Sequence, residues 1–130
     1  MNSREYRVLV TGGRDFNDTD LVAKVIWLIA GKCAERNLKM VLIHGAARGA
    51  DIACGFYAAS IGVETRVFPA NWDVHGKAAG FIRNKQMLDE GHPHICIAFP
   101  GGRGTANMVE QCKSRLVLVV DAAKAKDMFP

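Results

Sequence analysis

The sequence predicts an α/β fold of the Rossmann-like, doubly wound type: a mostly parallel five-stranded sheet with helices on both faces. Short β-rich runs alternate with stretches of helical periodicity along the whole chain, which is typical of right-handed βαβ crossovers. Most of these runs are apolar throughout rather than alternating with polar residues. That pattern favours strands buried on both faces of a parallel sheet.

Five runs are expected to form strands: residues 6–11, 40–44, 65–68, 94–99 and 116–120. The first helix follows a cap at Asn17 or Asp18. Its apolar residues have helical spacing: Leu21, Val22, Val25, Ile26 and Ile29. The second helix is expected over residues 50–60, with Gly62 as its stop.

The third helix is expected over residues 77–89, with Gly91 beyond its end. Its residues predicted to be buried are Ile82, Met87 and Leu88. A fourth helix begins near Thr105 and ends before Leu116. Residues 121–129 are expected to add one short turn.

Length and composition describe a single globular domain over residues 1–130. Hydrophobic residues make up 49% of the chain and charged residues 23%, without a run of about 18 apolar residues that could span a membrane. The first ten residues lack a secretory signal pattern, so we expect a cytoplasmic protein. The four cysteines form no C-x-x-C pair, which favours buried reduced thiols over disulfides or a metal site.

Glycine and arginine occur together in the loops expected after three strands. These loops read TGGRDF from Thr11, HGAARGAD from His44 and PGGRGT from Pro100. One glycine-rich turn is weak evidence, since tight turns often require glycine. Three such turns at the carboxyl edge of one sheet favour a phosphate or ribose site, because ligands bind there in doubly wound folds.

The usual nucleotide-binding signatures are absent. The first loop lacks the spacing of G-x-G-x-x-G, and the chain contains no G-x-x-x-x-G-K-[ST] sequence. An ordinary NAD site and a P-loop NTPase are therefore disfavoured, and no cofactor or metal is predicted. The net charge of +4 is too mild and scattered to mark a nucleic-acid surface, but it suits an anionic ligand.

These three loops, together with GFIRNKQM from Gly80, resemble the SLOG superfamily. This Rossmann-like group includes the lonely-guy phosphoribohydrolases and the DNA-processing protein A lineage. The chain is most similar to the small single-domain YspA/cpYpsA-related SLOG branch, and the resemblance covers nearly its whole length. It implies a doubly wound sheet and a site for a nucleotide or a nucleotide-derived ligand.

The resemblance assigns the expected ligand-binding residues. They are Gly12, Gly13 and Arg14 in the first loop, Gly45, Arg48, Gly49 and Asp51 in the second, Arg83 and Asn84 on the third helix, and Gly101, Gly102, Gly104 and Thr105 in the phosphate-binding turn. Pro100 and Arg103 of the same turn complete the expected set, Arg103 as a candidate guanidinium partner of the phosphate. The backbone amides of that turn and the Thr105 hydroxyl would face the anion. His44 and Trp72 are added as candidates from their positions at strand ends.

Three of these candidates, Trp72, His44 and Asp51, also have a purely structural interpretation. Trp72 could stack on a purine or cover the edge of the core. His44 could reach the cleft or be an ordinary strand-end histidine. Asp51 could bond ribose hydroxyls, act as a base or only cap a helix.

One position departs from the lonely-guy pattern P-G-G-x-G-T-x-x-E. The glutamate that serves those enzymes in cleaving the N-glycosidic bond is replaced by Met108, and a thioether cannot act as an acid or a base. Glu110 lies about 200° further around the helix. Another carboxylate such as Asp15 or Asp51 could act instead, and Asp51 and Arg83 are the candidate catalytic residues.

The sequence thus predicts a protein that binds a phosphorylated ribonucleoside or an ADP-ribose-like ligand, as a sensor or a processing protein. An N-glycosidase or phosphoribohydrolase acting on nucleoside monophosphates is the second hypothesis, and a DNA-binding accessory protein is the third. Apolar helices such as LVAKVIWLIA favour a homo-oligomer, a dimer or larger. No membrane partner is expected.

Overall fold

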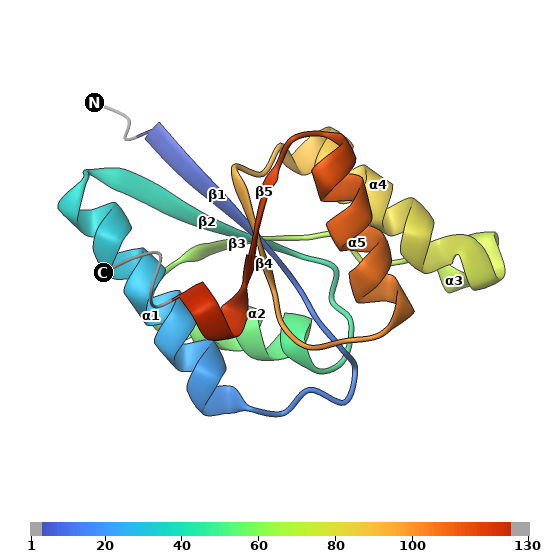
Figure 1. The fold of residues 1–130 in the computed structure, drawn as a ribbon, viewed down its shortest axis with the longest axis horizontal. Coiled ribbons are helices and arrows are strands. Elements are labelled where there is room, and N and C mark those ends of the chain that lie inside the picture. The colour runs from blue at the N-terminus through green and yellow to red at the C-terminus, as the bar shows by residue number, and fades with distance from the viewer. Residues whose placement is uncertain (1–3, 126–130) are drawn as a thin grey trace.

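The computed structural model describes residues 4–125, and within them a single five-stranded sheet. The strands are β1 (Arg4–Thr11), β2 (Leu38–His44), β3 (Glu64–Val67), β4 (Ile95–Ala98) and β5 (Leu118–Asp121). All adjacent pairs are parallel, and the strand order is β3-β2-β1-β4-β5 (Figure 1). The order reverses between β1 and β4, so the crevice at a topological switch point lies at the carboxyl ends of these two strands.

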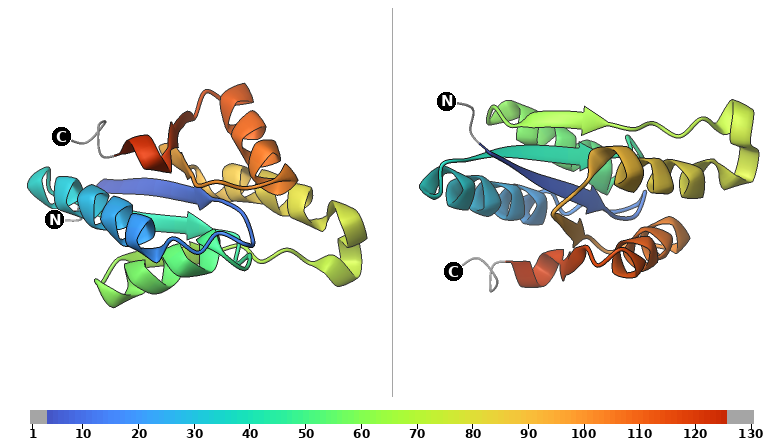
Figure 2. Two further views of the ribbon diagram at one scale, coloured as in Figure 1. Left: turned by 60° about the horizontal axis from the view of Figure 1, so that its bottom comes forward. Right: turned by 90° about the horizontal axis from the view of Figure 1, so that it is seen from above.

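The helices cover both faces of the sheet, which confirms the predicted fold class. They are α1 (Thr19–Glu35), α2 (Ala50–Ser60), α3 (Trp72–His75), α4 (Ala79–Gly91) and α5 (Arg103–Ser114). Short 3₁₀ turns cover Gly76–Ala78 and Ala122–Lys124. Helices α1 and α2 pack on one face, and α4 and α5 on the other (Figure 2).

Alternate residues of the central strands supply the two cores. In β1, Val8 and Val10 face α1 and α2, while Leu9 faces α4 and α5. None of the three is exposed to solvent. Burial on both faces explains why the strand sequences are continuously apolar.

The first two helices begin and end at the predicted signals. The Asp18 side chain caps α1 by accepting a hydrogen bond from the amide of Leu21 at 3.1 Å. Helix α2 covers the predicted residues, and Gly62 follows it with a φ of +82°, in the left-handed region that favours glycine.

Three expectations for later elements are corrected. Helix α3 is not predicted by periodicity, because its single turn depends on the cap that Asn71 provides to the amide of Val74. The third predicted helix continues through Gly91 to a left-handed residue at His92. Ile82 is 42% exposed rather than buried, since it lies about 200° around α4 from the buried Asn84.

The last strand and the tail also differ in detail. Strand β5 begins at Leu118 rather than residue 116, because Leu116 has a φ of +59° and belongs to the preceding turn. The predicted short turn in the tail is present at Ala122–Lys124. Residues 126–130 of the tail lie outside the described residues.

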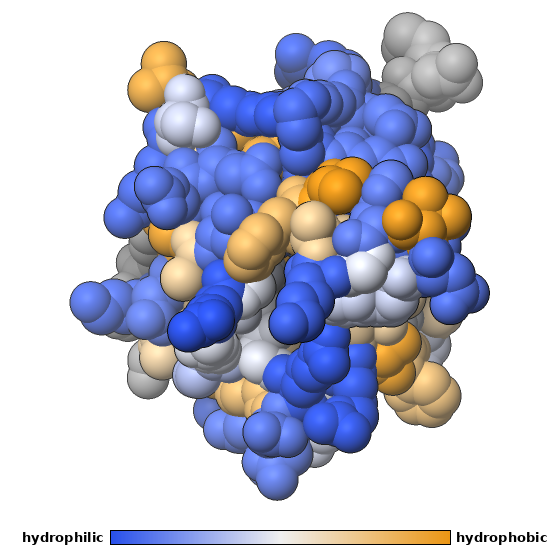
Figure 3. Space-filling model, turned by 90° about the vertical axis from the view of Figure 1, so that its right-hand side faces the viewer, coloured by the Kyte–Doolittle hydropathy of each residue, from blue (hydrophilic) through white to orange (hydrophobic). Residues whose placement is uncertain are grey.

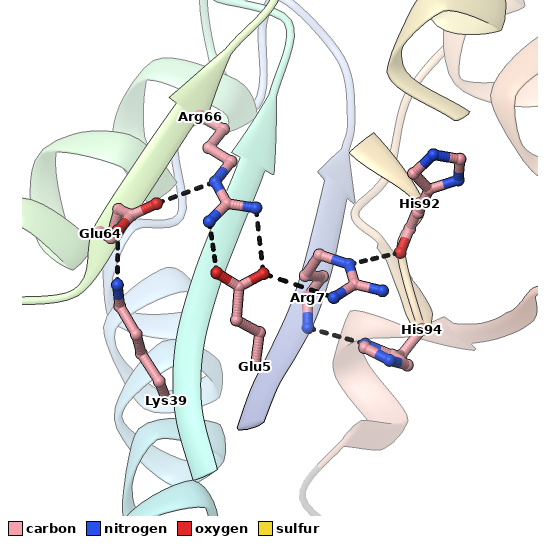
Figure 4. Close-up of polar contacts among 7 residues, drawn as sticks. All are labelled: Glu5, Arg7, Lys39, Glu64, Arg66, His92 and His94. Carbon is pink, nitrogen blue, oxygen red and sulfur yellow. Dashed lines mark hydrogen bonds and ion pairs between the residues drawn. The ribbon is translucent and has the colours of Figure 1, made fainter. Parts of the chain in front are cut away.

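Charged side chains cover the amino-terminal half of the sheet on the α4 side (Figure 4). Arg66 holds Glu5 through both carboxylate oxygens, at 3.1 and 2.5 Å, and bonds Glu64 at 2.8 Å. Lys39 bonds Glu64 at 2.7 Å. The hydrogen bonds from Arg66 hold the pKa of Glu5 below its usual value. Arg66 and Lys39 are therefore already paired with acids.

The four cysteines, Cys33, Cys54, Cys96 and Cys112, are buried and form no disulfide, as the sequence predicts. Within residues 4–125, no helix combines the length and apolarity needed to cross a bilayer. In the same range, no three His, Cys, Asp or Glu side chains gather closely enough to hold a metal ion.

Candidate functional site

A hollow of about 780 Å³ lies at the carboxyl ends of the central strands, between the loops that follow β1 and β4 and the beginning of α4. Figure 3 shows the end of the molecule where α3 lies, with a largely hydrophilic surface and hydrophobic residues across its middle. Most of the predicted site residues line this hollow: Gly12, Gly13, Arg14, Asp51, Trp72, Arg83, Asn84, Pro100, Gly101, Gly102, Arg103, Gly104 and Thr105. We call it the edge cavity.

Several of the predicted glycines allow the loops to pack against one another. A Cβ on Gly13 would lie 3.0 Å from the Cα of Gly101, and the Gly13 amide donates to the carbonyl of Pro100 at 2.8 Å. A Cβ on Gly101 would collide with the Thr105 hydroxyl and the Gly13 nitrogen. A Cβ on Gly49, whose φ is +90°, would collide with the carbonyl of Gly13. These residues serve packing, and the Gly13 amide is not free for an anion.

Two glycines at the start of α5 lie in open space instead. No heavy atom lies within 4 Å of a Cβ built on Gly102 or Gly104. Neither residue has a positive φ, so the backbone conformation does not require glycine at either position. No side chain caps α5 at Gly102, and its first turn contains no acidic residue. The partial positive charge of this helix end therefore faces the edge cavity uncompensated.

The side chain of Asp51 holds the loop after β2 in place through hydrogen bonds to its backbone. Its Oδ2 accepts hydrogen bonds from the amides of Gly45 at 2.9 Å and Ala47 at 3.4 Å. Its Oδ1 accepts none from the described residues, and Asp51, which is 4% exposed, is one of the residues that line the edge cavity. Burial raises the pKa of Asp51, partly offset by these amides. One carboxylate oxygen thus remains available to the edge cavity.

Arg83 is held in place by α4 and by the β2 loop. Its Nε donates to Oδ1 of Asn84 at 3.0 Å, and its guanidinium donates to the carbonyl of Gly45 at 2.5 Å. Asn84 is 3% exposed and donates in turn to the carbonyl of Gly104 at 3.2 Å. Burial lowers the pKa of Arg83. The arginine–asparagine pair therefore links the β2 loop to the beginning of α5.

The edge cavity has an excess of positive charge. Four cations line it, Arg14, Lys77, Arg83 and Arg103, against the carboxylates of Asp15 and Asp51. Among residues 4–125, none of these four cations lies within 4.0 Å of a carboxylate oxygen, whereas Arg66 and Lys39 at the other end of the sheet do. The guanidinium of Arg14 lies 5.3 Å from the ring centre of Trp72, which is half exposed.

Four predicted site residues lie elsewhere. Gly45 and Arg48 line a smaller adjoining hollow of about 290 Å³, and Gly49 lies on the far side of the β2 loop. The exposed side chain of Arg48 pairs with Asp15 at 3.6 Å. His44 lies beneath the loop, where its Nδ1 accepts the amide of Ala46 at 3.0 Å.

Sequence reasoning did not assign several residues that line the edge cavity, among them Phe16, Lys77 and Phe81. Lys77 reads as an ordinary solvated residue at the start of a helix. Phe81 is 46% exposed on the polar side of α4. The signal that could have identified Phe81 is its position, since it lies two residues before Arg83, which was predicted to reach the same cavity.

Comparisons with known proteins identify the family. A model of the YspA, cpYpsA-related SLOG family matches residues 6–75. The chain belongs to this family. A relative of known sequence, the Gene 61 protein of Mycobacterium phage D29, is 33% identical over 123 residues, which cover 88% of this chain and 94% of the phage protein. The SLOG superfamily is associated with nucleotide-derived ligands.

Solved structures were also compared with this SLOG chain. The X-ray structure of TM1055 aligns with a TM-score of 0.64 and 12% identity, over 87% of this chain and 71% of that one. DNA processing protein A from Streptococcus pneumoniae aligns with a TM-score of 0.49 and 18% identity, over 97% of this chain and 62% of that one. The likeness to TM1055 shows the shared fold.

Met108 has a structural role in this SLOG chain. Its side chain is fully buried between α5 and the sheet, in a cluster with Leu9, Met87 and Cys112. A carboxylate at this position would be buried among apolar groups. Glu110, two residues later, is exposed to solvent.

The histidine beneath the β2 loop predicts a pH dependence of stability. Burial and the nearby charge of Arg83 lower the pKa of His44, and only a neutral Nδ1 can accept the amide of Ala46. The folded state therefore binds fewer protons than the unfolded state as pH falls through about 6.5, and the free energy of unfolding decreases.

Urea denaturation at pH 7.5 and 5.5 measures this effect. We expect lower stability at pH 5.5 in the wild type and a smaller loss in His44→Asn, whose amide oxygen can accept the same hydrogen bond without titrating. His94, whose pKa burial also lowers, keeps some acid sensitivity in both proteins. An equal loss in the two proteins would contradict the role given to His44.

Proposed function

We propose that the edge cavity binds a phosphorylated ribonucleoside or an ADP-ribose-like ligand. The observation that carries this proposal is the group of four unpaired cations around the uncapped start of α5. An anion is the ligand that such an arrangement favours, since helix amides and guanidinium groups both donate to phosphate oxygens. A volume of about 780 Å³ lies within the range of small-molecule sites.

The cavity offers a different partner to each part of such a ligand. The phosphate lies at the amides that follow Gly102, where the two open glycines allow close approach. Oδ1 of Asp51 accepts hydrogen bonds from ribose hydroxyls. The base stacks on Trp72 or Phe81, which both present exposed aromatic surface to the cavity.

Cleavage of the N-glycosidic bond is the second candidate, and the open oxygen of Asp51 is the observation that favours it. Met108 cannot supply the acid of the lonely-guy pattern, and of the two carboxylates that line the cavity, the buried Asp51 could replace it better than the fully exposed Asp15. Its raised pKa suits proton transfer nearer neutral pH. Arg83 would then hold the phosphate of the substrate.

The test is calorimetric titration with adenosine and guanosine monophosphates and ADP-ribose, on the wild type and Gly104→Ala. The methyl group added to Gly104 enters open space, so we expect stability to be unchanged or raised by up to about 1 kcal/mol. The same methyl group occupies the space of the phosphate, so affinity is expected to fall by about tenfold or more, roughly 1.4 kcal/mol.

Two results would count against the proposal: no binding of any of these nucleotides to folded protein, or equal affinities in the two proteins. Chromatography of the same mixtures separates the two candidate functions. Free base released by the wild type but not by Asp51→Asn would establish cleavage. Asparagine keeps an oxygen for the amides of Gly45 and Ala47, so the loop remains closed in this variant.

A further inference from the structure

Helix α1 carries an uncovered stripe on the side away from the sheet. It consists of Asp20, Ala23, Lys24, Trp27 and Gly31, at helical spacings of three and four. Trp27 is 65% exposed, although tryptophan is usually well buried. A large aromatic residue in this position has no role in the core that α1 forms with the sheet.

Gly31 is equally unexplained by contacts within the chain. It lies inside α1, where glycine weakens a helix relative to alanine, and no heavy atom lies within 4 Å of a Cβ built on it. Its backbone has the ordinary negative φ of a helix, so neither packing nor conformation requires glycine. The absence of a side chain leaves this part of α1 open to close approach by another segment of chain.

A hollow of about 750 Å³ lies beside this stripe, between the first halves of α1 and α2. Its walls include Thr19 and Ala23 from α1 and Ile52, Phe56 and Tyr57 from α2. Phe56 is 79% exposed and Ile52 50%. Trp27 and Phe56 alone expose on the order of 300 Å² of surface, since an aromatic side chain presents about 150–250 Å².

The stripe and the hollow complement each other on two copies of the chain. If two α1 helices cross antiparallel about a two-fold axis at Ala23, a residue four positions after the axis faces one four positions before it. Trp27 of one copy then faces Thr19 of the other, at the rim of the partner hollow. The same rotation places Asp20 of each copy opposite position 26 of the other copy. Asp20 is then offset from the Lys24 of that copy by about 3 Å along the helix axis, given a rise of about 1.5 Å per residue.

We propose that α1 and α2 form a two-fold homodimer interface in which Trp27 of each protomer enters the hollow of its partner. The contact is isologous, as expected for a cyclic dimer. A stable interface buries about 800 Å² on each partner, and in this arrangement residues 19–27 of the two α1 helices face each other over about 12 Å. The aromatic pair supplies a substantial part of that area, with opposite charges at the rim.

The first test is sedimentation analysis of the full chain between about 1 and 100 μM. We expect a dimer, and an increase of about 30-fold or more in its dissociation constant in Trp27→Glu, as for an interface hot spot. The matched control is Leu116→Glu, because Leu116 is 94% exposed at the opposite edge of the sheet. A wild type that stays monomeric, or dissociation caused by Leu116→Glu instead, would overturn the proposal.

The second test does not depend on weakening the dimer. Ala23→Cys places a thiol at the proposed axis and should give a disulfide-linked dimer under mild oxidation, since the native cysteines are buried. Ala34→Cys is the control, because its two thiols would lie about 33 Å apart along the helices. No cross-link in Ala23→Cys, or equal cross-linking in both variants, would exclude this arrangement.

Discussion

Replacing Arg83 with glutamine is expected to weaken nucleotide binding by about 30-fold, roughly 2 kcal/mol, because the charge-assisted bonds of a partly buried guanidinium to phosphate are lost. The side chain is positioned for this role by Asn84 and the carbonyl of Gly45, and no acid among the described residues lies within ion-pair distance. Arg83→Lys keeps the charge without the planar fork and should bind with intermediate affinity.

Arg48→Gln is the matched control for this prediction. Arg48 lies in the β2 loop that Arg83 contacts, but its side chain does not line the edge cavity, is 77% exposed and is already paired with Asp15. We expect its loss to change affinity by less than about threefold, as for other exposed ion pairs. Calorimetric titration of both variants with the same nucleotide measures the difference. Equal losses would show that the phosphate lies nearer the smaller hollow than we propose.

Gly49→Ala is expected to have the largest effect on stability, a loss of about 3 kcal/mol or more in the free energy of unfolding. Its φ of +90° and ψ of −122° suit only glycine, and the new Cβ would collide with the carbonyl of Gly13. That carbonyl also accepts the amide of Ala50 at 3.2 Å, so the clash disturbs the junction of two loops.

Gly62→Ala separates conformation from collision. Gly62 has a similar φ of +82°, but no heavy atom lies within 4 Å of its Cβ position. We expect this variant to lose only about 1–2 kcal/mol, the cost of the left-handed conformation. Guanidinium denaturation of both proteins gives the comparison. Similar losses would mean that the loops do not pack as closely as the structure indicates.

The fold could be predicted from the sequence because its determinants are local. Continuous apolar runs such as VLV in β1 and MVLI in β2 indicate buried parallel strands, and their alternation with helical periodicity predicts the order of elements. The cap at Asp18 and the stop at Gly62 are short-range signals of the same kind. Helix α3 could not be predicted, because a single helical turn is too short to show a periodic pattern of apolar residues.

The location of the candidate site was predictable for a related reason. Loops that follow parallel strands meet at one edge, so TGGRDF and PGGRGT had to be neighbours. Which glycines allow the loops to pack and which leave space for a ligand was not predictable, since this depends on distances between loops. Gly13 and Gly101 touch each other, whereas Gly102 and Gly104 face open space. Similarly, only the structure shows that one oxygen of Asp51 closes a loop while the other stays open.

The most direct test of the central claim is an amide NMR titration of the 14.2 kDa chain with ADP-ribose and with adenosine monophosphate. The account predicts saturable shifts of the Gly102, Gly104 and Thr105 amides, together with the indole resonance of Trp72. Shifts that leave these amides unchanged, or no shift anywhere in the folded protein at millimolar nucleotide, would contradict it.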